Sequence, residues 1–398
     1  MDRRGFLDTC AKGCMAAGIA PMLSRVPDVP PMAMGAVGNV SNVPARYFKP
    51  LENQEIKCLL CPRHCQIRPG ERGLCGVREN VDGVYVTKVY GKPAAIHGDP
   101  MEKGPFFHFL PATKTLALGT AGCNLTCMYC QSWQFAQRRP EQTDNESLPP
   151  DELVAQVRKY GLRSITFTYS EPMVAVEYLA DTAKAARAAG IKMAMHTSAS
   201  SNPGPLKDIC GLMDAVNIDL KSYSRSFYDD VVGCKIETIL ENTKLVAGTD
   251  VWLELTFLAV PGYNTDPAVF KLMCQWIAIT LGDQVPLHIS RFFPAYRLRN
   301  VPATSTDTLK DLRKIAYDTG LRYVYLGNMP GDPGESSYCP KCGAKMIYRN
   351  NYESTFTAFD PRVAHFPTSW PYVSTAPLLE PTLSFLGGYA SYYVLTGV

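Results

Sequence analysis

From about Lys114 onward, short and largely apolar runs alternate with longer amphipathic ones along the chain. Amphipathic runs predict helices at 150–161, 173–190, 236–248, 266–282 and 304–320, and several of them end at a glycine, a typical stop signal. The apolar runs have the length of buried strands and lie at 115–119, 163–169, 191–196, 215–220, 252–258, 286–290 and 322–327. This alternation indicates parallel strands joined by helical crossovers.

Both a doubly wound sheet and a barrel are compatible with that alternation. Six or seven strand–helix units are few for a complete eightfold barrel, so we expect an open, partial (β/α)6 TIM-like barrel. The predicted organisation is a leader and Pro-rich linker at 1–50, a Cys-rich region at 51–105, the core domain at 106–330, and a Cys-containing appendage with a divergent tail at 331–398.

Composition narrows the class of protein. The 398 residues are 46% hydrophobic and 19% charged, which is enough for a substantial buried core. The formal net charge is only +3, with no long run of either sign, so the sequence gives no reason to expect nucleic acid as a partner. The apolar segment 377–398 is interrupted by Glu380, Pro381 and paired glycines, and we expect no transmembrane helix.

The first residues resemble a twin-arginine export signal, with Arg3-Arg4 followed by Phe6-Leu7 and a weakly apolar stretch. Such a signal predicts periplasmic export, and a frayed basic terminus in a cytoplasmic protein is the alternative. Localisation stays open between the two.

Fourteen cysteines are distributed in clusters. Gaps of two or three residues favour ligation of a metal by thiolates of one loop over a disulfide framework. We expect the scattered Cys210, Cys234 and Cys274 to be buried small apolar residues. The clusters are Cys10 with Cys14, then Cys58, Cys61, Cys65 and Cys75, then Cys123, Cys127 and Cys130, and finally Cys339 with Cys342.

The triplet Cys123, Cys127 and Cys130 follows the first predicted strand, in a loop that begins Gly119-Thr-Ala-Gly. Loops after the strands form the active site in parallel α/β folds. A structural zinc site needs four protein ligands, whereas three thiolates on a cubane iron–sulfur cluster leave one iron open to a small molecule. The C-x3-C-x2-C spacing, with Tyr129 before the last cysteine, resembles that of the radical S-adenosylmethionine (SAM) superfamily.

This resemblance implies an enzyme in which SAM chelates the open iron of a [4Fe-4S] cluster. Reductive cleavage of SAM then gives a 5′-deoxyadenosyl radical that abstracts hydrogen from a substrate, and an external low-potential electron donor is required. Tyr129 is expected to pack against the adenine. A fortuitous or zinc-binding cysteine loop is the alternative interpretation.

Residues at later strand ends match further elements of the superfamily. Glu171 in TYSEPM resembles the acid of a Gly-Gly-Glu-Pro element that receives the SAM amino group, but Tyr169-Ser170 replaces both glycines. A carboxylate suits a cationic ammonium group. Ser198 or Ser200, after the third strand, is a weaker candidate for the ribose.

Asp219 and Lys221 are two residues apart and therefore lie on one side of a strand end. A similar Asp-Leu-Lys in the pyruvate formate-lyase activating enzymes places Lys221 at the SAM carboxylate, and a plain ion pair is the alternative. Arg291 is a candidate for binding a substrate carboxylate or phosphate. The isolated His97, His108 and His288 are expected to make structural hydrogen bonds.

Segments outside these elements resemble the AmmeMemoRadiSam system radical SAM enzymes, relatives of the pyruvate formate-lyase activating enzymes. They are IKCLLCPRHCQIRPGERGLCGVREN, NIDLKSY, AVPGYN, SRFFPAY, YVYLGNMPG and SYCPKCGAKMI, and they span about residues 58–352. The resemblance supplies no established substrate, which is left as a small molecule or a protein. Two rival functions are a glycyl-radical activase acting on a partner protein and an iron–sulfur electron carrier. Glu171 and the open three-thiolate loop argue against the electron carrier.

The remaining clustered cysteines offer further metal sites. Cys58, Cys61, Cys65 and Cys75 can close a four-thiolate shell around an auxiliary cluster or a structural zinc. Cys339-Pro-Lys-Cys342-Gly is typical of half a zinc knuckle, and members of the family often continue with a second Cys-x2-Cys. Here the tail at 354–398 has no cysteine, so either the half-site takes ligands from elsewhere or it is lost, through divergence or a shifted reading frame.

Overall fold

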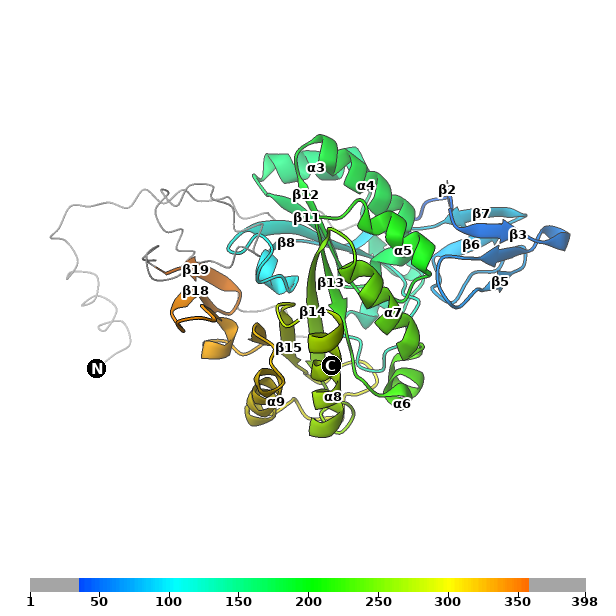
Figure 1. Ribbon diagram of the computed structural model, residues 1–398. Coiled ribbons are helices and arrows are strands. Elements are labelled where there is room, and N and C mark those ends of the chain that lie inside the picture. The colour runs from blue at the N-terminus through cyan, green and yellow to red at the C-terminus, as the bar shows by residue number, and fades with distance from the viewer. Residues whose placement is uncertain (1–35, 358–398) are drawn as a thin grey trace, which may run out of the picture. The chain divides into compact units, whose positions relative to one another are not determined.

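A computed structural model describes residues 36–357 of the chain, and the expected export signal, Cys10, Cys14 and most of the cysteine-free tail lie outside them. An eight-stranded sheet forms its centre, in the order β16-β15-β14-β13-β12-β11-β9-β8 (Figure 1). Seven strands are parallel: β9 (Lys114–Thr120), β11 (Ser164–Phe167), β12 (Lys192–Thr197), β13 (Ala215–Asp219), β14 (Trp252–Ala259), β15 (Leu287–Arg291) and β16 (Val324–Gly327).

The order of the parallel strands decides between the two fold classes. A doubly wound sheet reverses its strand order at a switch point, whereas these strands follow one another in chain order, as in a barrel. At one edge β8 (Pro93–Pro100) pairs antiparallel with β9, and within residues 36–357 it makes no pairing with β16 at the other edge. The expected partial barrel is therefore confirmed, and all seven predicted strands are present.

Helices connect the parallel strands (Figure 1), and α8 (Pro267–Thr280) begins at a typical start signal. Asp266 caps α8 by accepting from the backbone N–H groups of Ala268 and Val269, and Pro267 follows at the first helical position. Five helices match the predicted runs, and α5 (Pro203–Cys210) was not predicted because its Pro-Gly-Pro start is typical of a turn. The five are α3 (Pro150–Lys159), α4 (Val176–Ala188), α7 (Ile236–Ala247), α8 (Pro267–Thr280) and α9 (Thr306–Asp318). No helix in the described part of the chain is long and apolar enough to cross a membrane.

Before the barrel, residues 43–87 form two small antiparallel sheets, which combine the end of the predicted linker with the Cys-rich region. One has the order β2-β7-β6 and the other β3-β4-β5. A buried ion pair joins the first sheet to the barrel, because Arg78 of β6 donates to both carboxylate oxygens of Glu177 in α4, at 2.9 and 2.7 Å. Their strands are β2 (Val43–Pro44), β3 (Phe48–Pro50), β4 (Ile56–Cys58), β5 (Gln66–Ile67), β6 (Arg78–Val81) and β7 (Val84–Thr87).

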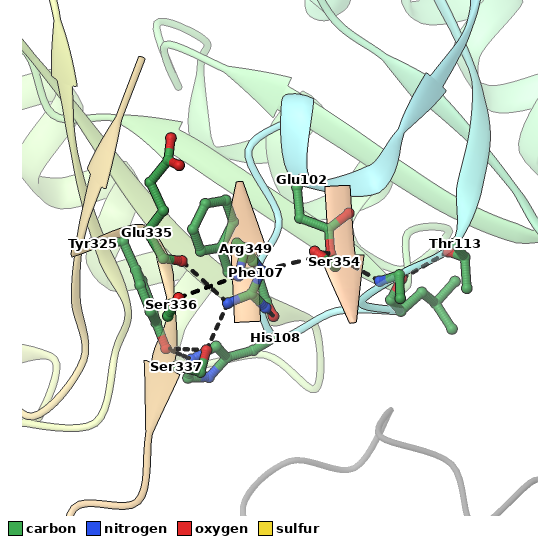
Figure 2. Close-up of polar contacts among 12 residues, drawn as sticks. Glu102, Phe107, His108, Thr113, Tyr325, Glu335, Ser336, Ser337, Arg349 and Ser354 are labelled. Atoms are coloured by element: carbon green, nitrogen blue, oxygen red, sulfur yellow. Dashed lines mark hydrogen bonds and ion pairs between the residues drawn. The ribbon is translucent and has the colours of Figure 1, made fainter. Parts of the chain in front are cut away.

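A three-stranded ribbon of β17 (Ser337–Tyr338), β18 (Lys345–Asn350) and β19 (Glu353–Phe356) follows the last barrel strand. Figure 2 shows how Arg349 of β18 ties the ribbon to the barrel: its guanidinium donates to the Phe107 carbonyl at 2.7 Å and, within the ribbon, to the Ser337 hydroxyl of β17 at 2.7 Å. The His108 ring contacts the Tyr325 hydroxyl at 2.6 Å in the same network. This histidine therefore makes a structural hydrogen bond, as expected from the sequence.

A buried carboxylate organises the barrel interior beside that network. Glu254 of β14 accepts hydrogen bonds from the backbone N–H groups of residues 107, 108 and 109, from the Trp252 indole, and shares one with His288 at 2.7 Å. Burial alone would raise the pKa of Glu254, but the hydrogen bond with His288, the charges of His288 and His108 and the backbone N–H groups together outweigh it, and the pKa falls to about 2. The carboxylate thus fixes the 107–109 segment against the sheet.

Candidate active site

The Cys123–Cys130 loop leaves the carboxyl end of β9 and is held from several sides by backbone hydrogen bonds. Thr126 and Met128 donate to the carbonyls of Val232 and Val231, and Met128 in turn accepts from the Arg297 N–H after β15. Asn124 adds a side-chain bond to the Ser200 carbonyl at 2.6 Å. The loop is therefore fixed by segments that follow β12, β13 and β15, although its own residues include little regular structure.

The three thiols of this loop are largely shielded from water. Burial raises the pKa of Cys130 to about 12, and it also raises the pKa values of Cys123 and Cys127. The charge of Cys127 adds to the effect of burial on the pKa values of both other thiols. The Lys221 ammonium opposes the effect of burial at Cys127. Without a bound cation these groups are neutral thiols, and a positively charged metal centre is what would stabilise them as thiolates.

Glu171, at the start of the short 3-10 helix Pro172–Ala175 after β11, is buried and accepts four hydrogen bonds. Oε1 accepts from the Thr197 hydroxyl at 2.6 Å and from the Met173 N–H at 3.2 Å. Oε2 accepts from the Ser198 N–H at 2.9 Å and from its hydroxyl at 2.5 Å. Ser198 therefore contacts Glu171 directly, and the carboxylate is oriented from the end of β12, a contact that the sequence did not reveal.

Tyr169 stands where the superfamily element has a glycine, and its backbone shows why that position matters. Its φ is 68°, in the left-handed region that glycine adopts most easily, at a cost of about 1–2 kcal/mol for other residues. The hydroxyl donates to Asp99 of β8 at 2.5 Å, and Ser170 donates to the Thr120 carbonyl at 2.7 Å. The turn that presents Glu171 thus has a left-handed residue without a glycine, and side-chain contacts of Tyr169 and Ser170 hold it.

Asp219 and Lys221 form an ion pair, with Nζ 2.6 Å from Oδ2, as one of the two interpretations of their spacing predicted. His196 of β12 contacts the other carboxylate oxygen at 2.9 Å. Burial alone would raise the pKa of Asp219, but Lys221 and His196 outweigh it and the pKa is lowered. Lys221 also lies 5.9 Å from the centre of the Tyr129 ring, at a cation–π distance. The pair therefore borders the cysteine loop.

Tyr129 is buried, and its ring stacks on Phe227 with centroids 6.1 Å apart. Its hydroxyl has no hydrogen-bond partner within the described chain. This buried hydroxyl, beside three thiols and a lysine, is available to hydrogen-bond a further group bound at the loop. The residues around the loop fit a cationic cluster with an open position and a ligand that carries an amino and a carboxylate group.

Sequence reasoning missed several residues of this site because they come from other strands. His196 and Thr197 lie at the end of β12. The Tyr228 hydroxyl accepts a hydrogen bond from the Lys221 N–H at 3.0 Å. Cys234 is half-buried rather than a core residue, and its charge interactions include Cys127 and Lys221. Cys210 and Cys274 are buried as expected. In the sequence, only the motif His-Thr-Ser at a strand end pointed to His196 and Thr197.

The remaining candidates are Arg291 and the two other described cysteine clusters. Arg291, at the end of β15, donates to the Thr304 carbonyl at 2.8 Å. Cys339 is buried in an apolar cluster with Tyr323 and Met346, whereas Cys342 is exposed. The four cysteines at 58, 61, 65 and 75 line one cavity. Among residues 36–357, no group of three or more His, Cys, Asp or Glu side chains is gathered closely enough around one point to hold a single metal ion.

Comparison with known proteins adds to this geometry. Residues 118–271 match the model of the Radical SAM superfamily. A Methanocaldococcus jannaschii protein named "Uncharacterized protein MJ0808" is 39% identical over 316 residues, which cover 79% of this chain and 94% of the relative. The 7-carboxy-7-deazaguanine synthase of Rhodopirellula baltica is 28% identical over 119 residues, 29% of this chain and 44% of the relative.

Among solved structures, a domain of the pyruvate-formate lyase-activating enzyme from Bacteroides vulgatus matches with a TM-score of 0.38 and 22% identity, over 42% of this chain and 99% of that one. The matched segment 118–271 contains the cysteine loop, Glu171 and the Asp219–Lys221 pair. The open parallel sheet and the three-thiol loop at the carboxyl end of its first strand agree with the match to the superfamily model. The protein is therefore an enzyme of the radical SAM superfamily, whose members use SAM and an iron–sulfur cluster.

Proposed function

We propose that this enzyme cleaves SAM reductively at the Cys123–Cys130 loop and uses the product to abstract hydrogen from a separate substrate. Cys123, Cys127 and Cys130 would hold the [4Fe-4S] cluster. When bound, the cluster and SAM supply one-electron cleavage of the sulfonium, with the electron coming from an external low-potential donor. The protein's own residues bind, orient and exclude water.

Two groups at neighbouring strand ends carry charges that match the methionyl end of SAM. Glu171 is positioned by Thr197 and Ser198, and its carboxylate suits an ammonium group. An ammonium has three donors, so Lys221 can hold Asp219 with one N–H and offer another to a carboxylate. Asp219 and His196 then act as positioning residues for Lys221.

The observation that carries this proposal is the convergence of these groups on the loop. The charge of Glu171 acts on Cys123, and the charges of Lys221 and Asp219 act on Cys127. An acid, a base and three thiols thus meet at one end of the parallel sheet, where such folds build active sites. An electron carrier has no use for a positioned acid and lysine beside its cluster.

The substrate side of the site is basic and aromatic. Trp133, just after the cysteine loop, stacks on Tyr296 with centroids 5.6 Å apart and planes 15° apart. The guanidinium groups of Arg138 and Arg299 each lie 5.7 Å from the Trp133 ring centre. Arg297 lies 5.2 Å from the Tyr296 ring centre. These groups favour a substrate, or a partner protein, that presents anionic groups.

Within the superfamily, the motifs between residues 58 and 352 support membership of the AmmeMemoRadiSam system enzymes. That assignment leaves the substrate as a small molecule or a protein. A glycyl-radical activase would additionally need a partner whose glycine loop reaches the Trp133–Tyr296 surface.

The test uses anaerobically reconstituted protein with dithionite and SAM, with 5′-deoxyadenosine and methionine as the readout. We expect cleavage by the wild type and none by Cys127→Ala, which removes one cluster ligand. Cys274→Ala is the matched control, because Cys274 is an equally buried thiol on α8, and it should keep cleavage. Retained cleavage in Cys127→Ala would overturn the assignment.

A further inference from the structure

The cysteine quartet of the N-terminal region forms a second site that the chemistry above does not use. Cys58, Cys61, Cys65 and Cys75 come from β4, from the loop that follows it, and from the segment before β6, and all four line one cavity. Among the described cysteines none is in a disulfide. The four thiols are therefore available together.

The four thiols behave as a mutually coupled group. Burial raises the pKa of Cys75 to about 12 and also raises the pKa of Cys61. The charges of Cys58 and Cys65 raise the pKa of Cys61 further, and those of Cys58 and Cys61 act on Cys75. The thiolate is the metal-ligating form of cysteine, so four thiols around one cavity offer a complete set of protein ligands to a metal centre.

Two buried hydrogen-bond donors on the cavity wall lack partners. Arg78 is 1% exposed and Tyr85 is 2% exposed. The Arg78 guanidinium uses its two terminal nitrogens on Glu177, Val174 and Arg46, while its Nε–H has no acceptor within the described chain.

Tyr85 presents the same situation from the neighbouring strand. Its hydroxyl lies beside Cys58, at a geometry short of a hydrogen bond, and has no other partner within the described chain. Leaving a buried donor unpaired costs about 1–3 kcal/mol, so two of them on one wall indicate acceptors that come with a bound group. Cluster sulfurs and thiolates are such acceptors, and hydrogen bonds to them tune cluster potentials.

The space between the thiols favours a cluster over a single zinc ion. Zinc draws its sulfurs to about 2.3 Å from one point, whereas a cubane binds each thiolate at a different iron. Here the four cysteines line one cavity, yet among residues 36–357 no three such side chains gather closely enough around one point to hold a single ion. The cation of Arg78, acting on Cys75, offsets the negative charge that four thiolates bring.

This second site is packed against the first. Asn124, which lies between Cys123 and Cys127 in sequence, also lines the quartet's cavity and interacts with Cys61. Gly122 has φ of 81°, and a Cβ there would stand 2.4 Å from the Cys75 carbonyl oxygen, so only glycine fits. Arg63 adds weak hydrogen bonds of 3.4 Å to the Asn124 carbonyl.

We propose that Cys58, Cys61, Cys65 and Cys75 hold a fully thiolate-ligated [4Fe-4S] cluster, built directly against the loop of the first cluster. With four protein ligands this cluster has no open iron and does not bind SAM. Because this site is packed against the Cys123–Cys130 loop, we expect the two clusters to interact magnetically when both are reduced.

The test measures iron, acid-labile sulfide and zinc per chain in the full-length protein after anaerobic reconstitution. We expect about eight irons in the wild type and about four in both Cys61→Ala/Cys75→Ala and Cys127→Ala, because each removes one cubane. The double variant Cys210→Ala/Cys274→Ala removes two buried thiols away from both sites and should keep about eight irons. Electron paramagnetic resonance of the dithionite-reduced wild type should show two components that broaden one another, of which SAM shifts one.

The outcomes separate the two assignments. About four irons and one zinc in the wild type, with the zinc lost in Cys61→Ala/Cys75→Ala, would overturn the cluster in favour of a structural zinc. About four irons, no zinc and no change in the double variant would overturn any metal site at the quartet. Loss of SAM cleavage together with eight irons would instead contradict the proposed function and leave the second cluster standing.

If Cys61→Ala/Cys75→Ala does not fold, the single variant Tyr85→Phe tests for a cluster at the quartet. It keeps the ring and removes only the unpaired hydroxyl, so iron content should stay at about eight. One of the two resonance components should change its reduction potential, while the component that SAM shifts should not. Identical potentials in Tyr85→Phe and the wild type would contradict a cluster beside Tyr85.

Discussion

Replacing Glu254 with glutamine should strongly destabilise the barrel, although the two side chains have nearly the same size. The carboxylate accepts hydrogen bonds on both oxygens, three of them from consecutive backbone N–H groups at 107–109. Glutamine has one acceptor and one donor. If its amide nitrogen replaces Oε2, His288 can change tautomer but the Phe107 N–H faces another donor.

The size of the effect follows from two terms. One buried N–H without an acceptor costs about 1–3 kcal/mol. The pKa of Glu254 falls from 4.5 to about 2 on folding, and at 1.36 kcal/mol per unit the folded protein prefers the carboxylate by roughly 3 kcal/mol. Because the folded pKa is the lower one, this contribution is complete above pH 4.5 and is lost as the pH falls through about 2. We expect Glu254→Gln to lose about 3–5 kcal/mol of unfolding free energy at pH 7.

The assay is urea unfolding of anaerobically prepared protein at pH 7, followed by circular dichroism and tryptophan fluorescence. Glu241→Gln on α7 is the control, since Glu241 is 69% exposed and pairs only with Lys244, and its loss should stay below about 1 kcal/mol. The reasoning fails if Glu254→Gln unfolds at the same urea concentration as Glu241→Gln.

Two further changes test the site and the acid response. Glu171→Gln should weaken SAM binding about 10- to 100-fold, as expected for a lost charge-assisted hydrogen bond, with iron content unchanged; equilibrium dialysis that finds binding within about threefold of the wild type would remove Glu171 from the SAM site. His108→Gln should reduce the loss of unfolding free energy on acidification. Burial lowers the pKa of His108 from 6.5 to about 3, so between these values the unfolded chain binds a proton that the folded chain does not. Through this group the wild type loses about 1.4 kcal/mol of unfolding free energy per pH unit below 6.5. Urea midpoints between pH 7 and pH 5 measure that slope, and equal slopes for both proteins would contradict it.

The sheet was predictable because buried parallel strands leave a local record. Each is a short apolar run between amphipathic ones, and a loop of three closely spaced cysteines after the first such run already indicates metal chemistry. The helix α5 was missed because its Pro-Gly-Pro start is locally a turn, and only its packing makes it a helix. The edge strand β8 carried no clear alternation, and its pairing with β9 defines it.

By itself the sequence determined the strands, their helical crossovers and the three thiols, because each depends on neighbours within a few residues. The tertiary structure alone decided which groups surround those thiols. Thr197 and Ser198 orient Glu171 from the end of another strand, and His196 contacts Asp219 from β12. It also decided that the Cys75 carbonyl packs on Gly122, joining two cysteine clusters that the chain separates by more than forty residues. Hydrogen bonds and burial between distant segments act at a few ångströms in space, and no local pattern of residues records them.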